Sequence, residues 1–332
     1  MKFSIIIATL NNEQTIEKTI LSLKVQKFKD FEIIFVDGGS KDRTLKIIAD
    51  HHLKNIRVIN QVHRGVYNAF NLGVEFKEGE GPIFNNPIRN VDAINNLPTF
   101  NAQDLSYVYK CVSNIRRALP ADLPLIGFCG SPWTLAAYSI EGGSSKDFLF
   151  TKNFIGENPQ KTQELLSLYT NACFEYLREQ VIAGIDAIQI FDSWAGLLNK
   201  EDYEIYSLYY INDLVRQLKE DSITANIPVI LFARQPQGGI EQLSVCKPDC
   251  ISLYWDESID NSIDILKGKI AIQGSLNPQI LKEDNSIIYD EVKSMLNKFS
   301  NYPGYIFNLG HGLTPDIDPD KVKFLTDTIR EL

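Results

Sequence analysis

Six apolar runs of strand length recur between residues 124 and 312, and each ends in glycine or polar residues. Helical patterns separate these runs, so the chain alternates strand and helix. The runs are 124–130, 186–196, 227–235, 248–256, 269–277 and 304–312, and the helical patterns include 165–184, 203–220, 289–299 and 319–331. Strands that are apolar on both faces indicate a parallel sheet covered by helices. Six such units favour an α/β fold of the (β/α) barrel type over an open sheet.

In a barrel of this kind the reactive groups lie at the carboxyl ends of the strands. Those ends carry Cys129-Gly130, Asp192-Ser193-Trp194, Arg234, Trp255-Asp256, Gln273-Gly274-Ser275 and Asn308 to Gly312, and Tyr138 follows the first strand. They contain no nucleophile elbow, no HExxH zinc motif and no P-loop. The residues predict a pocket of hydrogen-bond donors between aromatic walls, which suits a large, flat ligand with polar edges.

Each candidate also has a purely structural explanation. Tyr138 could be an ordinary core tyrosine, and Ser193 could cap the local backbone. His311 is harder to explain in this way, because the glycines on both sides of it allow a ligand to approach closely.

Composition limits the partners. The formal net charge is 33 − 42 = −9 over 332 residues, which argues against a nucleic-acid or membrane partner, and a polyanionic ligand would need a locally positive pocket. No signal peptide or span of transmembrane length is visible, and the five cysteines are scattered, so a reduced, cytoplasmic setting is expected. Cys246 and Cys250 lie four residues apart without further ligands, so we expect no metal site there.

The first 71 residues form a different series. Strand-like runs at 2–10, 31–36 and 56–60 alternate with helical patterns, which predicts a Rossmann-like βαβαβ segment. The stretches SIIIATLNNEQTIEKTI, IIFVDGGSKDRT and RGVYNAFN resemble the start of a family 2 (GT-A) glycosyltransferase. The resemblance implies that Asp37 contacts the nucleoside base of a sugar nucleotide. The family's Asp-x-Asp metal pair is absent and Asn68 stands where Asp is usual, so a half-sheet without transferase activity is favoured.

Residues 72–332 resemble uroporphyrinogen decarboxylase. The matching stretches are EGEGPIFNNPIR, PLIGFCGSPWTLAAYSIEGGSSK, AIQIFDSWAG, IQGSLNP and YIFNLGHGLTP. The resemblance implies a single (β/α)₈ barrel that is usually a homodimer, uses no cofactor and acts in haem and tetrapyrrole biosynthesis. The family removes CO₂ from the four acetate side chains of uroporphyrinogen. Tyr138, Ser193 and His311 match family residues that line the cleft and hold substrate carboxylates.

The chain departs from that family at its amino end. The family's Arg-Gln-Ala-Gly-Arg-Tyr stretch, which grips carboxylates, and its Asp in a Ser-Asp-Ile-Leu segment, which steadies the cationic intermediate, are both missing. Smaller departures are Tyr254, Ser275 and Asn277. No catalytic residue can therefore be carried over, and the sequence predicts an impaired carboxy-lyase that still binds porphyrinogen.

The resemblances divide the chain into residues 1–71 and residues 72–332, a barrel without its own first two βα units. Residues 72–90 read as an extended connection. We expect the amino-terminal strands to help close the barrel; the rival arrangement is a separate lobe beside an open barrel. Two other functions stay open, a sugar-nucleotide-binding or transferase protein and a non-catalytic chimera.

Overall fold

The structure is a computed structural model of the chain. It describes residues 3–9, 12–25, 31–37, 40–52, 56–60, 70, 74–77, 81–314 and 316–332. Asn68 and the Gly38-Gly39 pair lie outside the described residues. Within the described residues, no helix is both long and apolar enough to cross a bilayer.

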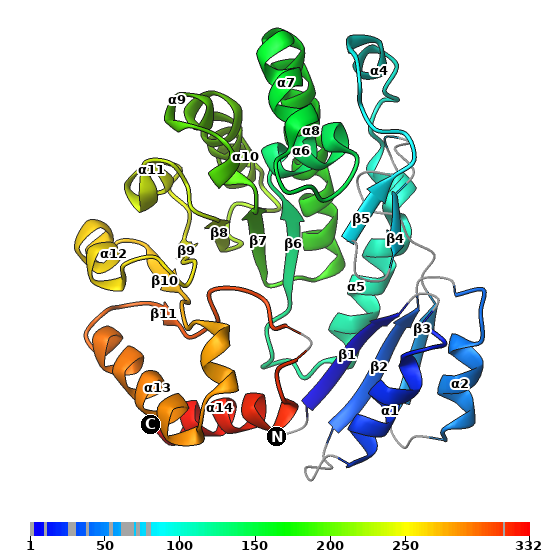
Figure 1. Ribbon diagram of the computed structural model, residues 1–332, viewed down its shortest axis with the longest axis vertical. Helices are drawn as coiled ribbons and strands as arrows, with labels where there is room; N and C mark the ends of the chain where they lie inside the picture. Colours follow the sequence, from blue (N-terminus) through cyan, green and yellow to red (C-terminus); the bar gives the residue numbers. More distant parts are fainter. Residues whose placement is uncertain are drawn as a thin grey trace.

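The six predicted strands are all present and form one parallel sheet. They are β6 (Ile126–Gly130), β7 (Ala187–Asp192), β8 (Val229–Ala233), β9 (Cys250–Ser252), β10 (Ala271–Gln273) and β11 (Tyr305–Ile306), and the sheet order is β11-β10-β9-β8-β7-β6. Neighbours in the sheet are therefore neighbours in the sequence, as in a (β/α) barrel. Figure 1 shows the strands as an inner arc with helices outside them.

Helices connect the strands and cover the outer face of the sheet. The longer ones are α6 (Pro132–Glu141), α7 (Leu149–Glu157), α8 (Pro159–Ala183), α10 (Tyr209–Glu220), α13 (Asn285–Phe299) and α14 (Pro319–Glu331). The shorter ones are η2 (Ala195–Leu197), α9 (Lys200–Tyr203), the π-helix η3 (Glu204–Leu208), α11 (Gly239–Val245), α12 (Ile259–Leu266) and η4 (Pro278–Lys282). The helices predicted at 165–184, 289–299 and 319–331 are confirmed.

Helix α8 illustrates how the sequence builds this outer layer. Pro159 begins the helix, where its missing N–H has no cost, and Gly184 ends it with a φ of +109°. Its buried residues include Leu165, Tyr169 and Cys173, which recur at the spacing of one helix face. That face packs on α6 and β6 and fixes the strand from outside.

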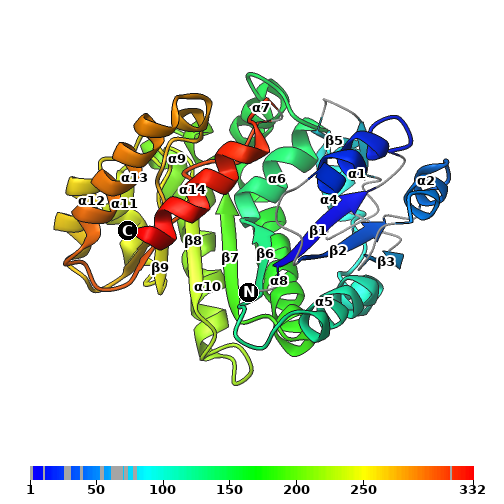
Figure 2. The same ribbon diagram turned by 90° about the horizontal axis from the view of Figure 1, so that it is seen from below.

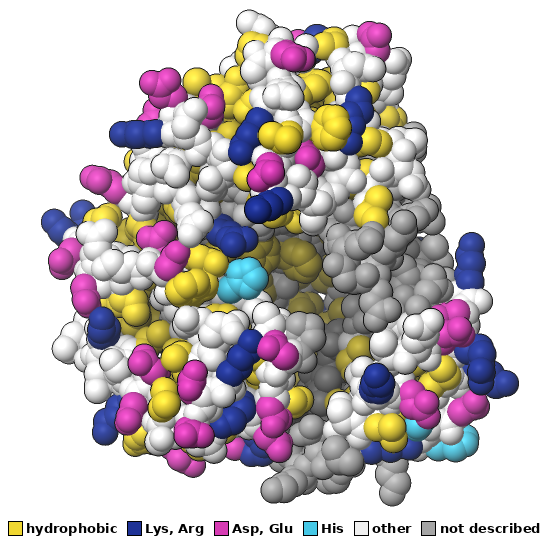
Figure 3. Space-filling model, viewed as in Figure 1, with side chains coloured by type: hydrophobic (Ala, Val, Ile, Leu, Met, Phe, Trp, Pro, Cys, Tyr) yellow, Lys and Arg dark blue, Asp and Glu magenta, His cyan; other side chains and the backbone are white. Residues whose placement is uncertain are grey.

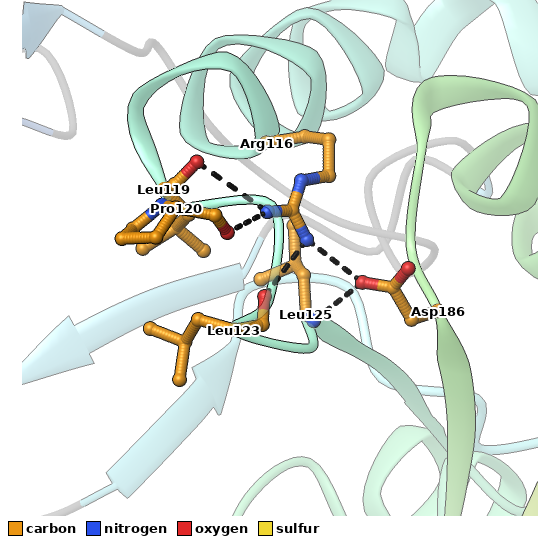
Figure 4. A network of polar contacts seen from close by, with 6 residues as sticks. All are labelled: Arg116, Leu119, Pro120, Leu123, Leu125 and Asp186. Atoms are coloured by element: carbon orange, nitrogen blue, oxygen red, sulfur yellow. Dashed lines mark hydrogen bonds and ion pairs between the residues drawn. The ribbon is translucent and has the colours of Figure 1, made fainter.

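Arg116 holds the start of the sheet in place (Figure 4). It lies on α5 (Ser106–Ala118) and donates to the carbonyls of Leu119, Pro120 and Leu123. It also pairs with Asp186 at 2.8 Å, and the same carboxylate accepts from the backbone N–H of Leu125. The network ties the segments that enter β6 and β7 to one guanidinium.

The amino-terminal segment has the predicted element order. β1 (Phe3–Thr9), α1 (Ile16–Val25), β2 (Phe31–Asp37), α2 (Thr44–Asp50) and β3 (Ile56–Asn60) build a parallel sheet in the order β1-β2-β3. It has a small core of its own, formed by Ile16, Ile20, Leu23, Ile33, Phe35 and Ile48. Figures 1 and 2 place this sheet on the β6 side of the molecule, away from α12 and α13.

The expected closure of the barrel by these strands is wrong. In the part of the chain that the structure describes, β1 pairs only with β2, β6 only with β7, and β11 only with β10. Among the described residues, the buried side chains of α1, α2 and β2 form a core separate from that of the barrel, which accounts for this arrangement.

The stretch expected as an extended connection contains a hairpin. β4 (Val74–Lys77) and β5 (Gly81–Phe84) pair antiparallel, and α4 (Val91–Asn95) and η1 (Ala102–Leu105) lead from there to α5. The Phe84 N–H donates to the carbonyl of Gly142, and Ile83 forms a bridge with Gly143. The hairpin is thus fixed by the end of α6, a partner far away in the sequence.

Candidate active site

The carboxyl ends of β6 to β9 support a row of aromatic rings, which we call the aromatic arc. Its members are Phe128, Phe191, Phe232 and Tyr254, and successive ring centroids lie 6.0, 5.9 and 6.4 Å apart. On β6 the residues on either side of Phe128 face the helices: a side chain at Gly127 would meet Ile185. Phe128 therefore faces the inside of the barrel, where its side chain is 61% exposed.

The face of the molecule in Figure 3 is hollowed at its centre. Hydrophobic side chains lie at the bottom of the hollow, and basic and histidine side chains lie near its margin. An apolar wall with polar groups at the edge is the usual form of a small-molecule site. The pocket that the sequence predicts, with hydrogen-bond donors between aromatic walls, stays a prediction.

His311 lies at the end of the arc. Its ring is 6.0 Å from that of Tyr254 in an edge-to-face arrangement, and the side chain is exposed. The preceding Gly310 is required by packing, because a Cβ there would lie 2.4 Å from the backbone N of Trp255. A Cβ on Gly312 would meet no atom within 4 Å. The first glycine thus positions the histidine loop against the strand-end segment that carries Trp255.

Ser193 and Tyr138 lie on adjoining segments at the other end of the arc. The Ser193 N–H donates to Oγ1 of Thr134 at 3.0 Å, and the Tyr138 ring lies 5.6 Å from that of Trp194. The segments that carry these two residues therefore contact each other. Among the described residues no direct contact joins either of them to His311, and their binding of one ligand stays a prediction.

Asp192, the last residue of β7, is completely buried and turned toward the helices. Its two carboxylate oxygens accept hydrogen bonds from Ser131, Thr134 and Ser207, at 2.7, 3.3 and 2.7 Å. Burial raises its pKa to about 6, against the lowering effect of the three hydroxyls. Ser131 caps α6, and Thr134 accepts from the Ser193 N–H, so this carboxylate organises the turn that presents Ser193.

A buried amide cluster lies on the inner face of the sheet. Gln273 donates to Gln189 Oε1 at 3.2 Å and to Ser252 Oγ at 3.1 Å. The Nε2 group of Gln189 is buried and has no hydrogen-bond partner among the described residues. Gln189 is not among the site residues predicted from the sequence. Its position two residues before Phe191, on the same face of β7, is the signal that could have indicated it.

Asp37 is located at the end of β2 and is fully buried. Its carboxylate accepts hydrogen bonds from the backbone N–H and hydroxyl of Ser40, which holds the local turn. Within the described ranges, no group of three or more His, Cys, Asp or Glu residues is arranged to hold a metal. The five cysteines are buried and unpaired.

Comparison with known proteins identifies the family. The sequence profile described as "Uroporphyrinogen decarboxylase (URO-D)" matches residues 44–332. The chain belongs to the uroporphyrinogen decarboxylase family. A uroporphyrinogen decarboxylase of Ruthia magnifica is 40% identical over 265 residues, which are 80% of this chain and 76% of that protein. One from Acinetobacter baylyi is 41% identical over 268 residues, covering 80% of this chain and 75% of that protein.

A solved structure supports the fold. The methyltransferase from Methanosarcina mazei superposes with a TM-score of 0.62 at 15% identity, over 80% of this chain and 77% of that one. The match to the uroporphyrinogen decarboxylase family begins at residue 44, the first residue of α2, whereas the domain boundary predicted from the sequence follows residue 71. That boundary, and the glycosyltransferase resemblance with its role for Asp37, stay predictions.

Proposed function

We propose that the chain binds uroporphyrinogen in the hollow beside the aromatic arc and decarboxylates its acetate groups to form coproporphyrinogen, at a reduced rate. The observation that carries this proposal is the aromatic arc with His311 at its end, in a chain of the uroporphyrinogen decarboxylase family. Its relatives named as this enzyme are about 40% identical. The setting would be the cytoplasm, and a homodimer would follow the family.

The reaction requires an electron sink. Protonation of a pyrrole ring carbon creates a cation, and the acetate carboxylate then leaves as CO₂. A second proton adds to the remaining side-chain carbon to give the methyl group, and loss of the first proton restores the pyrrole ring. In this proposal the aromatic arc packs against the flat macrocycle, and the donors of His311, Ser193 and Tyr138 hold carboxylates at its edge.

The reduced rate follows from a missing carboxylate. Asp192 cannot serve as the group that steadies the cation, because its oxygens are occupied by three hydroxyls on the helix side of β7. The family's Asp and Arg stretches have no match in the sequence. Losing one electrostatic stabiliser of this kind lowers turnover by about 10²–10³.

The test is anaerobic turnover of uroporphyrinogen, with the products oxidised to porphyrins and separated by chromatography. The A. baylyi relative serves as the reference, and His311→Ala as the variant without the edge donor. We expect slow but measurable coproporphyrin formation that His311→Ala lowers further. A rate equal to that of the reference would contradict the impairment, and no turnover together with no porphyrin binding would contradict the function.

A further inference from the structure

Arg234 lies at the edge of the site, directly after β8, and has no acidic partner among the described residues. Its backbone is fixed, because its N–H donates to the Asp192 carbonyl at 3.0 Å and its own carbonyl accepts from Gly196. The guanidinium carbon lies 5.3 Å from the ring centroid of Tyr254. The partly buried side chain is therefore held near the same ring that His311 meets in an edge-to-face arrangement.

The carboxylates near Arg234 are engaged elsewhere. Asp192 accepts from three hydroxyls, and Asp256 accepts from the side chain of Gln235 at 2.9 Å. Arg116, Arg178 and Arg216 each pair with a carboxylate within 4 Å, but Arg234 forms no ion pair with any residue that the structure describes. A partly buried cation without a counter-charge is ready to bind an anion.

The geometry also selects the kind of anion. A guanidinium placed over an aromatic ring is held by the ring's electrons, and its N–H donors remain available for a planar acceptor such as a carboxylate. The chain carries a net charge of −9, so a ligand with many carboxylates is repelled overall and needs fixed cations where it binds.

We propose that Arg234 binds a side-chain carboxylate of the porphyrinogen, next to Tyr254 and His311, and is a specificity residue of the site. This inference rests on the proposed function and adds a cation that the sequence analysis noted only as a strand-end residue. It places carboxylate recognition directly after β8, within the barrel itself. The macrocycle would lie along the aromatic arc, with one carboxylate turned toward the carboxyl end of that strand.

Equilibrium binding of uroporphyrin, the oxidised and stable form of the substrate, tests the proposal on the full chain. Arg234→Met keeps the length of the side chain and removes its charge. We expect it to weaken binding by about 10- to 100-fold, the range for one charged hydrogen-bonding partner. Arg234→Lys keeps the positive charge but lacks the paired N–H donors of the guanidinium group. Its affinity for uroporphyrin should lie between those of the wild type and Arg234→Met. Raising the salt concentration should weaken the wild type more than Arg234→Met.

Arg117→Met is the matched control, because Arg117 is exposed on α5 and the charge change is the same. We expect its affinity to stay within about twofold of the wild type. Circular dichroism checks folding, and Arg234→Gln replaces Arg234→Met should the latter not fold. Unchanged affinity in a folded Arg234 variant overturns the inference and leaves the proposed function standing. Absence of uroporphyrin binding by the wild type and Arg117→Met overturns both.

Discussion

Asp192 shows how one buried side chain can organise a site without touching the ligand. It is fully buried, and its partners are hydroxyls, not cations. Ionised carboxylates are costly to bury in this way, and the raised pKa of about 6 expresses that cost. Burying Asp192 fixes the turn after β7, because the cap of α6 and the backbone of Ser193 both depend on the hydroxyl groups that Asp192 binds.

The raised pKa predicts a pH dependence of stability. Because the folded-state pKa lies above the ordinary value of 3.8, the folded protein holds a proton that the unfolded chain releases between pH 3.8 and about 6. The contribution of Asp192 to the free energy of unfolding is therefore greatest below that window and falls as the pH rises through it, by roughly 2–3 kcal/mol.

Asp192→Asn should abolish this component. The amide oxygen can still accept from Ser131 and Thr134, and its N–H₂ can donate to Ser207, so the variant should fold. Urea unfolding of both proteins at several pH values between 4 and 7 gives the difference in free energy of unfolding. We expect that difference to change steadily with pH up to about 6 and then to level off. Identical pH profiles for the two proteins would contradict the assignment.

At this scale the sequence predicted which residues stand at the strand ends but not what each one faces. Asp192 and Phe191 are adjacent, yet alternation along β7 turns Asp192 toward the helices and Phe191 toward the other rings of the aromatic arc. The distinction depends on the hydroxyls of Ser131 and Ser207, which come from other elements. A single strand motif does not contain that information.

At the scale of single elements, the loop after β11 depends on close packing of Gly310. Gly310 packs against the backbone of Trp255, and its N–H donates to the carbonyl of Leu276 at 2.9 Å. A methyl group there must displace the loop that carries His311. We expect Gly310→Ala to lower the free energy of unfolding by about 1–3 kcal/mol and to lower uroporphyrinogen turnover with it.

Gly312→Ala is the control in the same loop, because an added Cβ meets no atom within 4 Å. Its stability should stay within about 0.5 kcal/mol of the wild type. Thermal unfolding and the turnover assay compare the two variants directly. Equal effects of both substitutions would show that close packing on Trp255 does not position His311.

Element prediction succeeded where one segment contains its own pattern. The apolar runs that became β6 to β11 are such segments, and so is α8 with its glycine end. The hairpin β4-β5 was missed because its register is set by Gly142 and Gly143, at the end of α6. The helix predicted at 203–220 has the correct position, but the sequence pattern did not predict that its first part is the π-helix η3. Ser207 of η3 donates a hydrogen bond to Asp192.

For the whole molecule, the division into two hydrophobic cores is the main finding. The small core of the amino-terminal sheet contains Phe35 and the large one contains Ile190, both fully buried. The sequence could not exclude pairing of β1 with the edges of the barrel, because such a pairing joins segments more than a hundred residues apart. Whether β1 pairs with the barrel depends on which hydrophobic core buries its side chains. Helices α1 and α2, which are close to β1 in the sequence, provide such a core.

Two cores predict two thermal transitions. In calorimetry of the full chain we expect a smaller transition for the amino-terminal sheet and a larger one for the barrel, since the unfolding enthalpy grows with the number of residues. Phe35→Ala should lower the midpoint temperature of the smaller transition only, and Ile190→Ala that of the larger transition only. Each substitution should reduce the free energy of unfolding of its own unit by about 2–5 kcal/mol. One transition that both substitutions shift together would contradict independent cores.

The placement of the tryptophans gives the protein a built-in optical reporter. All three, Trp133, Trp194 and Trp255, belong to the barrel, and two of them lie in contact with Tyr138 and Tyr254 beside the hollow. Indole emission overlaps the strongest absorption band of porphyrins, so a bound macrocycle should quench it by energy transfer. Such quenching would measure the fraction of protein with bound porphyrin without a label. It would not report on changes in the amino-terminal sheet.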